Sequence, residues 1–315
     1  MFLNRKISTL FGCLLLLAAT KSYSQQEAQY TQYMWNPMLL NPAAAGSTNM
    51  LRAAVVYRKQ WVDIAGAPGT IAFVADAPAL SEKTALGIII AKDKIGIHDD
   101  VSIRANYAYR LPLKNGTLGM GLQAGVKNHQ AKYSQLDIKN ESDANFRSGD
   151  VSYFMPEFGF GLYYSNAKSY MGFSVPKIID NALGKSLFNT NSLEKRHYYL
   201  TAGHTFVLNT QFDILPSVLV KATEGAPLQA ELSTLVSYQK KISAGISYRT
   251  GASVNFLVQA KFYQNFSFGY SYDWATSILR SYNYGSHEIM VIYTASLGER
   301  LKLKKNRNVT NTEVK

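Results

Sequence analysis

The residues of this sequence best suited to proton transfer or metal binding are its five histidines, His98, His129, His197, His204 and His287. His204 precedes Thr205, but neighbouring residues of a strand point to opposite faces, so this hydroxyl is out of reach of the ring. His287 precedes Glu288, and one such pair provides too few ligands for zinc. No histidine belongs to a nucleophile motif such as G-x-S-x-G. We therefore expect no enzyme, no cofactor and no metal site.

The first 24 residues have the layout of an export signal. Arg5 and Lys6 form a basic start, an apolar stretch follows, and SYS at 22–24 is a small-x-small cleavage site. The residues at 10–13 superficially resemble a lipoprotein box, but the apolar run follows Cys13 instead of preceding it. Cys13 is the only cysteine, so removal of residues 1–24 leaves a chain without a disulfide or a reactive thiol.

Charged residues that alternate with apolar ones are the remaining candidates. Successive side chains of a strand point to opposite faces, so Arg52 and Arg58 share the face opposite Val55 and Tyr57. A Lys or Arg that faces lipid at mid-membrane costs about 2–4 kcal/mol, so in a membrane these charges must face inward. The candidate lumen charges are Arg52, Arg58, Arg104, Arg110, Asp213, Glu231, Lys261 and Asp273. They would favour anions in an open pore, or pair across a closed interior.

The clearest alternation of apolar and polar residues runs from 228 to 274. FSFGYSYDW at 266–274 places five aromatic residues on one face and Ser, Gly and Asp on the other. The chain is 47% hydrophobic, with 21 Tyr and 15 Phe, yet after residue 24 no apolar run approaches the roughly 18–20 residues of a membrane helix. Lipid tolerates only helices and closed barrels as spanning structures. The composition therefore fits a transmembrane β-barrel, with a secreted β-sandwich as the alternative.

Loop lengths favour the barrel. We predict fourteen strands, at 51–58, 70–77, 84–92, 101–111, 117–130, 155–164, 168–175, 196–205, 211–221, 228–238, 242–249, 253–261, 266–273 and 286–294. The connections after even-numbered strands are short, as at 112–116 and 239–241, and most of those after odd-numbered strands are longer, as at 93–100 and 131–154. Outer-membrane barrels have even strand numbers, short periplasmic turns and longer surface loops. The sequence thus predicts a transmembrane antiparallel barrel over 51–294, with both termini in the periplasm.

The C-terminal region, 295–315, reads as a basic periplasmic tail. The chain carries a net charge of +12, and residues 299–315 contain six Lys or Arg against two Glu. Basic runs bind nucleic acid in other settings, but an exported barrel rarely meets it. We therefore interpret this tail as solvated and expect no nucleic-acid partner.

Residues 25–50 precede the barrel and are too apolar for a free tail. Two Asn-Pro pairs break any regular element. We expect this segment to pack in the lumen, to lie at the periplasmic mouth or to bind a partner, through Tyr33, Trp35, Asn36, Pro37, Asn41, Pro42 and Gly46. Gly119, Gly121 and Gly125 alternate within a strand with no helix after it, so they are not a nucleotide-binding loop. Such glycines allow bending of the strand or close approach of a neighbouring segment.

Several motifs together resemble the PorP/SprF family. They are QYMWNPMLLNPAAAG at 32–46, YRKQW at 57–61, AGAPGT at 65–70, NYAYR at 106–110 and GSHE at 285–288, and the resemblance covers nearly the whole mature chain. It implies an outer-membrane protein of the type IX secretion system of Bacteroidota, with membrane lipid and other secretion components as partners. The family has no catalytic residue to carry over.

The resemblance leaves two subtypes open. Some members of the family link the outer membrane to the periplasmic motor ring. Others help to export or hold one large adhesin, often a gliding adhesin, through its C-terminal domain. The alternative function from the residues alone is an outer-membrane porin or small-solute channel, which requires an open lumen. The sequence itself does not distinguish an open lumen from a plugged one.

Overall fold

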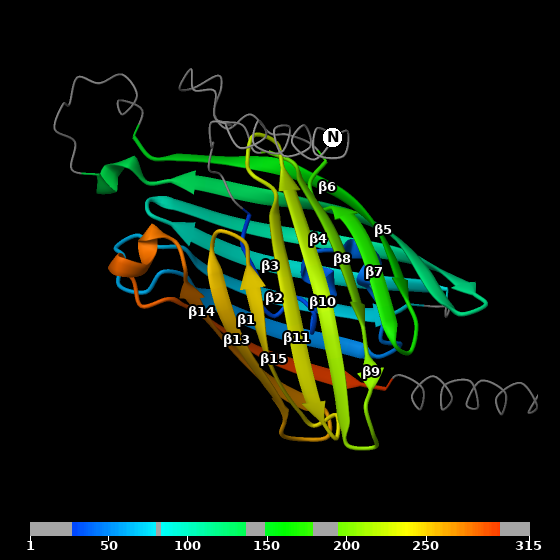
Figure 1. Ribbon diagram of the computed structural model, residues 1–315. Helices are drawn as coiled ribbons and strands as arrows, with labels where there is room; N and C mark the ends of the chain where they lie inside the picture. Colours follow the sequence, from blue (N-terminus) through cyan, green and yellow to red (C-terminus); the bar gives the residue numbers. More distant parts are fainter. Residues whose placement is uncertain (1–26, 80–82, 137–148, 179–194, 297–315) are drawn as a thin grey trace, which may run out of the picture.

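Antiparallel strands form one hydrogen-bonded ring in the part of the chain that the computed structural model describes, residues 27–79, 83–136, 149–178 and 195–296 (Figure 1). They are β1 (Leu51–Lys59), β2 (Gly69–Pro78), β3 (Thr84–Ile95), β4 (His98–Leu113), β5 (Gly116–Ala131), β6 (Val151–Ser165), β7 (Ser169–Val175), β8 (His197–His204), β9 (Phe206–Val207), β10 (Phe212–Thr223), β11 (Gln229–Tyr238), β12 (Ile242–Arg249), β13 (Ser253–Lys261), β14 (Phe266–Ala275) and β15 (Ser286–Ala295). The ring closes where β1 pairs with β15. Because β8 and β9 both pair with β10, they form one crossing, and the predicted fourteen-stranded antiparallel barrel is confirmed.

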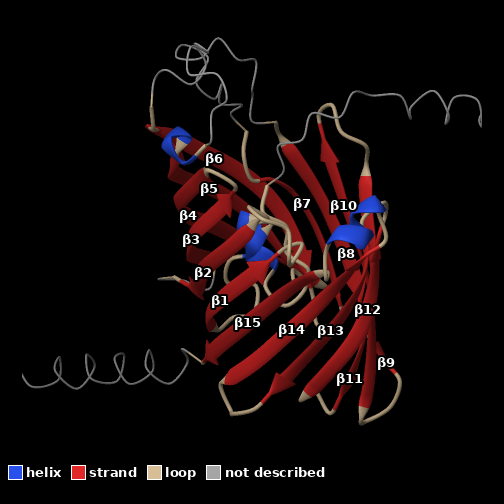
Figure 2. Cartoon of the chain, turned by 90° about the vertical axis from the view of Figure 1, so that its left-hand side faces the viewer, coloured by secondary structure: helices blue, strands red, loops and turns tan. Residues whose placement is uncertain are grey.

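Helical structure in the described ranges is limited to four short 3-10 turns. They are η1 (Pro37–Leu39), η2 (Pro42–Ala44), η3 (Tyr133–Gln135) and η4 (Ile278–Tyr282). Within those same ranges no helix is long and apolar enough to span a bilayer. Figure 2 shows η1 and η2 inside the ring of strands.

The strands β3 to β6 are longer than the sequence pattern predicts. β4 and β5 each have 16 residues and β6 has 15, whereas roughly 9–11 residues cross the apolar core. The predicted loop 93–100 is wrong, because Asp93 and Lys94 pair with Asp100 and Asp99 and only a tight turn at Gly96 remains. Gly96 has φ +56°, which glycine adopts without strain. Charged residues interrupt the hydrophobic alternation there, but their backbones continue the ladder.

The apolar face of the strands points outward, as predicted. In β14, Phe268 and Trp274 are exposed, whereas Ser271 and Asp273 on the opposite face are buried inside the ring. The same division holds along β1, where Tyr57 is exposed and Arg58 is buried. An apolar outside and a polar, buried inside is the arrangement of a barrel in lipid.

The two mouths of the barrel differ in their connections. We call the mouth where β1 and β14 end the long-loop mouth, because the connections β1–β2, β5–β6, β7–β8 and β14–β15 lie there. The other end, where β1 begins and β15 finishes, is the short-turn mouth. Leu51 pairs with Ala295 at this mouth, so the first and last strands do share one end, as an even number of crossings requires.

The described chain begins near the long-loop mouth, opposite the mouth where β1 begins. Thr31 is bonded to Asp273 and Glu288, near the long-loop ends of β14 and β15. Gly46 is bonded to Asp76, near the short-turn end of β2. The chain therefore runs through the lumen from the long-loop mouth to the short-turn mouth before β1 begins.

Candidate functional site: the segment inside the barrel

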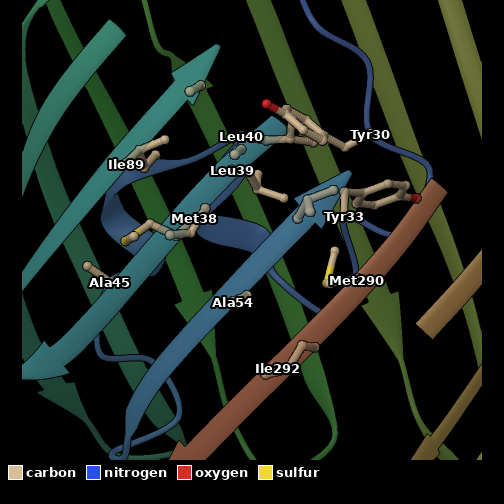
Figure 3. Close-up of a cluster of buried hydrophobic side chains, with 14 of the residues drawn as sticks. Tyr30, Tyr33, Met38, Leu39, Leu40, Ala45, Ala54, Ile89, Met290 and Ile292 are labelled. Carbon is tan, nitrogen blue, oxygen red and sulfur yellow. The ribbon is translucent and has the colours of Figure 1, made fainter. Parts of the chain in front are cut away.

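Residues 27–50, which we call the luminal segment, pack against the inner face of the barrel. Tyr30, Tyr33, Met38, Leu39 and Leu40 are buried in one apolar cluster with inward-facing residues of the wall, among them Ala54, Ile89, Met290 and Ile292 (Figure 3). In an interior that is otherwise rich in charge, this cluster provides the apolar contacts that hold the segment. Burial of one such large side chain stabilises a fold by about 1.5–3 kcal/mol.

The two Asn-Pro pairs give the luminal segment its shape. Pro37 and Pro42 each lie in the first turn of a 3-10 helix, where a missing N–H costs nothing. Asn41 caps the second turn, because its side-chain oxygen accepts a hydrogen bond from the N–H of Ala43 at 2.9 Å. These pairs break regular structure, as the sequence predicts, and they replace it with two tight turns that fit the lumen.

Glu288 holds the luminal segment by its backbone at the long-loop mouth. Its two carboxylate oxygens accept hydrogen bonds from the N–H groups of Thr31 and Gln32, each at 2.9 Å. The side-chain amide of Gln32 donates in turn to the backbone carbonyl of Glu288 at 3.0 Å. Hydrogen bonds to an ionised carboxylate are stronger than neutral ones, so this contact fixes both the position and the direction of the segment.

The hydroxyl of Thr31 lies at the centre of a buried charge network. It donates to the carboxylate of Asp273 at 2.8 Å and accepts from Arg58 at 3.0 Å and from Arg249 at 3.1 Å. A hydroxyl has one donor and two acceptor positions, and all three are used. No other side chain of the segment joins so many charged residues of the wall.

Two arginines connect the acids of this network. Arg58 pairs with Asp273 at 2.7 Å and with Glu288 at 3.2 Å. Arg249 pairs with Glu231 at 2.8 Å and with Asp273 at 3.1 Å. We call these five residues and Thr31 the latch. All are buried, and removal of one partner of a buried ion pair costs about 3–5 kcal/mol because the other charge is left uncompensated.

A second ionic cluster surrounds the start of the segment. Glu27 pairs with Lys177 at 3.0 Å, and Lys177 also pairs with Glu157 at 3.1 Å. Burial by itself raises the pKa of Glu27, but Lys177, with smaller contributions from His197 and Arg104, outweighs it and holds this pKa far below its usual range. Glu27 is therefore ionised at neutral pH and attaches the segment to the wall near the long-loop mouth.

Near the short-turn mouth the luminal segment is held mainly by its backbone and amides. Gly46 donates its N–H to Asp76 at 2.7 Å, and Asp76 is paired with Arg52 at 2.9 Å. The side-chain amide of Asn41 donates to the carbonyl of Leu162 at 2.9 Å. Further bonds join Ser174 to Leu40 and Arg110 to Asn49. The segment is thus bonded to the wall between Glu27 and Gln32 and again between Leu40 and Asn49, and the apolar cluster holds the part between them.

Glycines on the inner face make room for the segment. A side chain at Gly119 or Gly121 would overlap Ala43, and one at Gly161 would overlap the side chain of Asn41. The prediction that glycines of the fifth strand allow close approach of a neighbouring segment is confirmed for these two positions. Gly125 differs, because a side chain there would meet the backbone of the adjacent strand β4.

A small cavity of about 10 Å³ lies beside the segment near the latch, lined by residues of both the segment and the wall, including Gln29, Tyr30, Lys221, Glu231 and Arg249. This volume holds about one water molecule. In the described ranges no group of three or more His, Cys, Asp or Glu residues could hold a metal ion.

The structure brings three of the eight candidate lumen charges together and places the other five elsewhere. Arg58, Glu231 and Asp273 belong to the latch, Arg52 and Arg110 lie near the short-turn mouth, and Arg104 faces Glu157 at 3.6 Å. Asp213 is only partly buried and Lys261 is exposed, because both lie near the short-turn ends of their strands. In the segment, Tyr33, Asn36, Asn41, Pro42 and Gly46 are buried, whereas Trp35 and Pro37 are partly buried.

Several residues of the wall that hold the segment, Arg249 and Lys177 among them, were not among the sequence candidates. Glu288 holds the backbone of the segment, and Asp76 anchors Gly46. Alternation within their strands was the signal that could have found them, since Glu288 shares a face with Ser286 and Met290. In the sequence, Glu288 stands beside His287, and this pair resembles part of a metal site instead.

A closed antiparallel barrel with an apolar outer face and a chain segment bonded inside it defines an outer-membrane β-barrel protein. The family model described as "Type IX secretion system membrane protein PorP/SprF" matches residues 22–293. The chain belongs to this family, and it is an outer-membrane component of type IX secretion.

Solved structures similar to the chain are also outer-membrane proteins and channels. The Acinetobacter baumannii outer membrane protein Omp33 is 8% identical, with a TM-score of 0.43, over 78% of this chain and 98% of that one. A TodX deltaS2S3 mutant, described as a monoaromatic hydrocarbon channel, is 10% identical, with a TM-score of 0.49, over 90% and 98%. The Ralstonia pickettii toluene transporter TbuX is 10% identical, with a TM-score of 0.49, over 82% and 92%. No curated protein matches the sequence.

Proposed function

We propose that this protein is a plugged, non-conducting barrel that supports export and surface attachment of type IX cargo. The cargo is a large adhesin, such as a gliding adhesin, which the barrel handles through the adhesin's C-terminal domain. Linkage of the outer membrane to the periplasmic motor ring is the second role that membership of the family supports. The observation that carries the proposal is the latch, which fixes a chain segment across the lumen.

The latch argues against the alternative of a porin or small-solute channel. A diffusion pore needs a continuous water-filled path between its mouths. Here the luminal segment has buried residues from Tyr30 to Ala45, and bonds to the wall hold it near both mouths. Displacement of the segment would break the hydrogen bonds that Thr31 and Gln32 make with Asp273 and Glu288. It would also expose the apolar cluster to water, so the closed state is favoured.

A filled lumen leaves the two mouths and the outer surface as the places where partners bind. We assign cargo to the long-loop mouth and the motor ring to the short-turn mouth, in line with the surface and periplasmic sides predicted from the loop lengths. Thr48 and Asn49, at the end of the luminal segment, are exposed at the short-turn mouth. A partner at this mouth can therefore contact the segment as well as the turns.

Affinity purification from the native membrane tests this function. A tagged full-length chain should co-purify with secretion components or with an adhesin C-terminal domain, as identified by mass spectrometry. Deletion of residues 32–46 should abolish secretion or co-purification while a heat-modifiable barrel remains in the membrane. The matched control is Leu122→Ala, which shortens an exposed side chain on the outer face of β5, away from both mouths. Normal secretion without the protein, with no component recovered, would contradict the proposal.

A further inference from the structure

The loop between β14 and β15, residues 276–285, presents an exposed apolar surface that the secretion function does not explain. Ile278 is 89% exposed, Tyr282 is 70% exposed and Tyr284 is 71% exposed. Three of the loop's apolar residues, Ile278, Leu279 and Tyr282, lie in the 3-10 turn η4, at the end of β14 in Figure 1. Exposed apolar clusters of this kind mark contact with a membrane or with another protein.

This loop is held in one position on the outer flank of the barrel. Trp274 is the last outward-facing residue of β14, and the guanidinium carbon of Arg280 lies 4.3 Å from the centre of its ring. The backbone of the loop is also bonded to the β1–β2 loop, because Tyr284 donates to the carbonyl of Val62 at 3.0 Å and Val62 donates to that of Gly285 at 2.9 Å. η4 therefore lies beside the lipid-facing wall.

The apolar residues of η4 continue the lipid-facing surface. Tyr57, Tyr248 and Trp274 point outward at the long-loop ends of β1, β12 and β14 and are all exposed. Aromatic residues at this level form the belt that lies at the membrane–water interface. Because Arg280 joins η4 to Trp274, the exposed residues of η4 extend this belt beyond the strand ends without a break.

Arg280 supplies the charge that such a surface needs at the headgroup layer. It is the single charged residue of 276–285, and in the described part of the chain it has no carboxylate partner. The stacked ring of Trp274 orients its guanidinium group and leaves N–H donors along the edge. Planar donors of this kind bind the oxygens of a phosphate in pairs.

We propose that residues 276–285 are a lipid-binding foot, in which Arg280 binds the phosphate of an anionic lipid headgroup. Ile278, Leu279 and Tyr282 enter the interfacial layer beside it. The foot attaches the β14–β15 side of the long-loop mouth to the membrane surface. It fixes the height of this mouth above the bilayer and acts independently of the luminal segment.

Site-directed fluorescence in vesicles tests the foot. The mature chain lacks cysteine, so Ile278→Cys provides one thiol for an environment-sensitive dye in the otherwise intact protein. Glu224→Cys, in an exposed loop at the same mouth, is the matched control. The vesicles contain phosphatidylcholine with or without phosphatidylglycerol, and each lipid carries a headgroup-level quencher in turn. We expect a blue-shifted, lipid-quenched dye at 278 and a water-exposed dye at 224.

Arg280→Gln separates charge from apolar contact. One basic residue near an anionic surface contributes about 1 kcal/mol, so we expect Arg280→Gln to lower the preference of the 278 dye for phosphatidylglycerol about fivefold. The apolar insertion itself should persist. A dye at 278 that remains in water in both kinds of vesicle would overturn the proposal. Protection of this dye only after a secretion partner is added would also overturn it, because the surface would then be a protein contact.

Discussion

The carboxylate of Glu288 accepts the backbone N–H of Thr31 at 2.9 Å, although the two residues are 257 positions apart in the chain. One lies in the last strand of the barrel and the other in the segment that precedes the first strand. β15 also pairs with β1 to close the ring. Closure of the barrel and docking of the luminal segment therefore depend on the same strand, and we expect the two events to be coupled.

The Thr31 hydroxyl stabilises the protein through the latch. Thr31→Val keeps the shape of the side chain but removes the group that Arg58, Arg249 and Asp273 share. We expect the free energy of unfolding in detergent micelles to fall by about 1–3 kcal/mol, the cost of buried polar groups that lose their partner. Thr48→Val, at an exposed position of the same segment, should leave it unchanged. If Thr31→Val and Thr48→Val had the same free energy of unfolding, the role of Thr31 would be contradicted.

Loss of charge at Glu288 should loosen the luminal segment without loss of the barrel. Glu288→Gln breaks its pair with Arg58, and we expect the segment to leave the lumen more often. A thiol at the partly buried position 34, introduced as Met34→Cys, reports this motion through its rate of reaction with an impermeant maleimide. That rate should rise at least about tenfold, which corresponds to about 1.4 kcal/mol, but not in Glu224→Gln. An unchanged rate would show that Glu288 does not hold the segment.

Glu27 gives the docked segment a defined dependence on pH. Its pKa is lowered in the folded protein, since Lys177 and its neighbours outweigh the burial that raises it. Its contribution to stability is therefore fully present above the ordinary carboxyl pKa of 4.5 and is lost as the pH falls below that value. The free energy of unfolding should differ between the wild type and Glu27→Gln by a constant amount from neutral pH to about pH 5.5, and this difference should shrink in more acidic solution. A difference that grows on acidification would contradict the assignment.

The path of the luminal segment predicts on which side of the membrane its start at Glu27 lies. An epitope placed directly before Glu27 should be reached from the same side as Ser134→Cys in the β5–β6 connection. A thiol introduced as Lys240→Cys, in the turn between β11 and β12, should be reached from the other side. Labelling of intact cells with impermeant reagents measures this, and we expect the first two sites on the cell surface. Protection of the N-terminal epitope together with position 240 would contradict the path.

The alternation of apolar and polar residues predicts which side chains of the barrel wall face outward and which face the lumen, because each strand places successive residues on opposite faces. Alternation in β14 places Asp273 inside and Trp274 outside, whatever the rest of the chain does. The penalty for charge in lipid likewise places Arg58 in the lumen. The strand ends were less predictable, because the backbone of Asp99 and Asp100 continues to pair after the hydrophobic pattern has stopped.

The direction of the luminal segment could not be predicted in this way. It depends on contacts such as that between Thr31 and Glu288, which no local pattern encodes. An even number of strands predicts that β1 and β15 share a mouth, but it says nothing about a segment that runs back through the lumen. The apolar residues around Tyr33 indicated only that the segment must pack, and its polar contacts set the path.

Conductance across a planar lipid bilayer tests the central claim, a lumen closed by the luminal segment, most directly. The purified full-length protein should insert without forming a stable ion-conducting pore. The variant that lacks residues 32–46 should produce discrete, long-lived openings, because the lumen is then empty between the same strands. A wild-type protein that conducts as steadily as this deletion would contradict the account and would favour a diffusion channel.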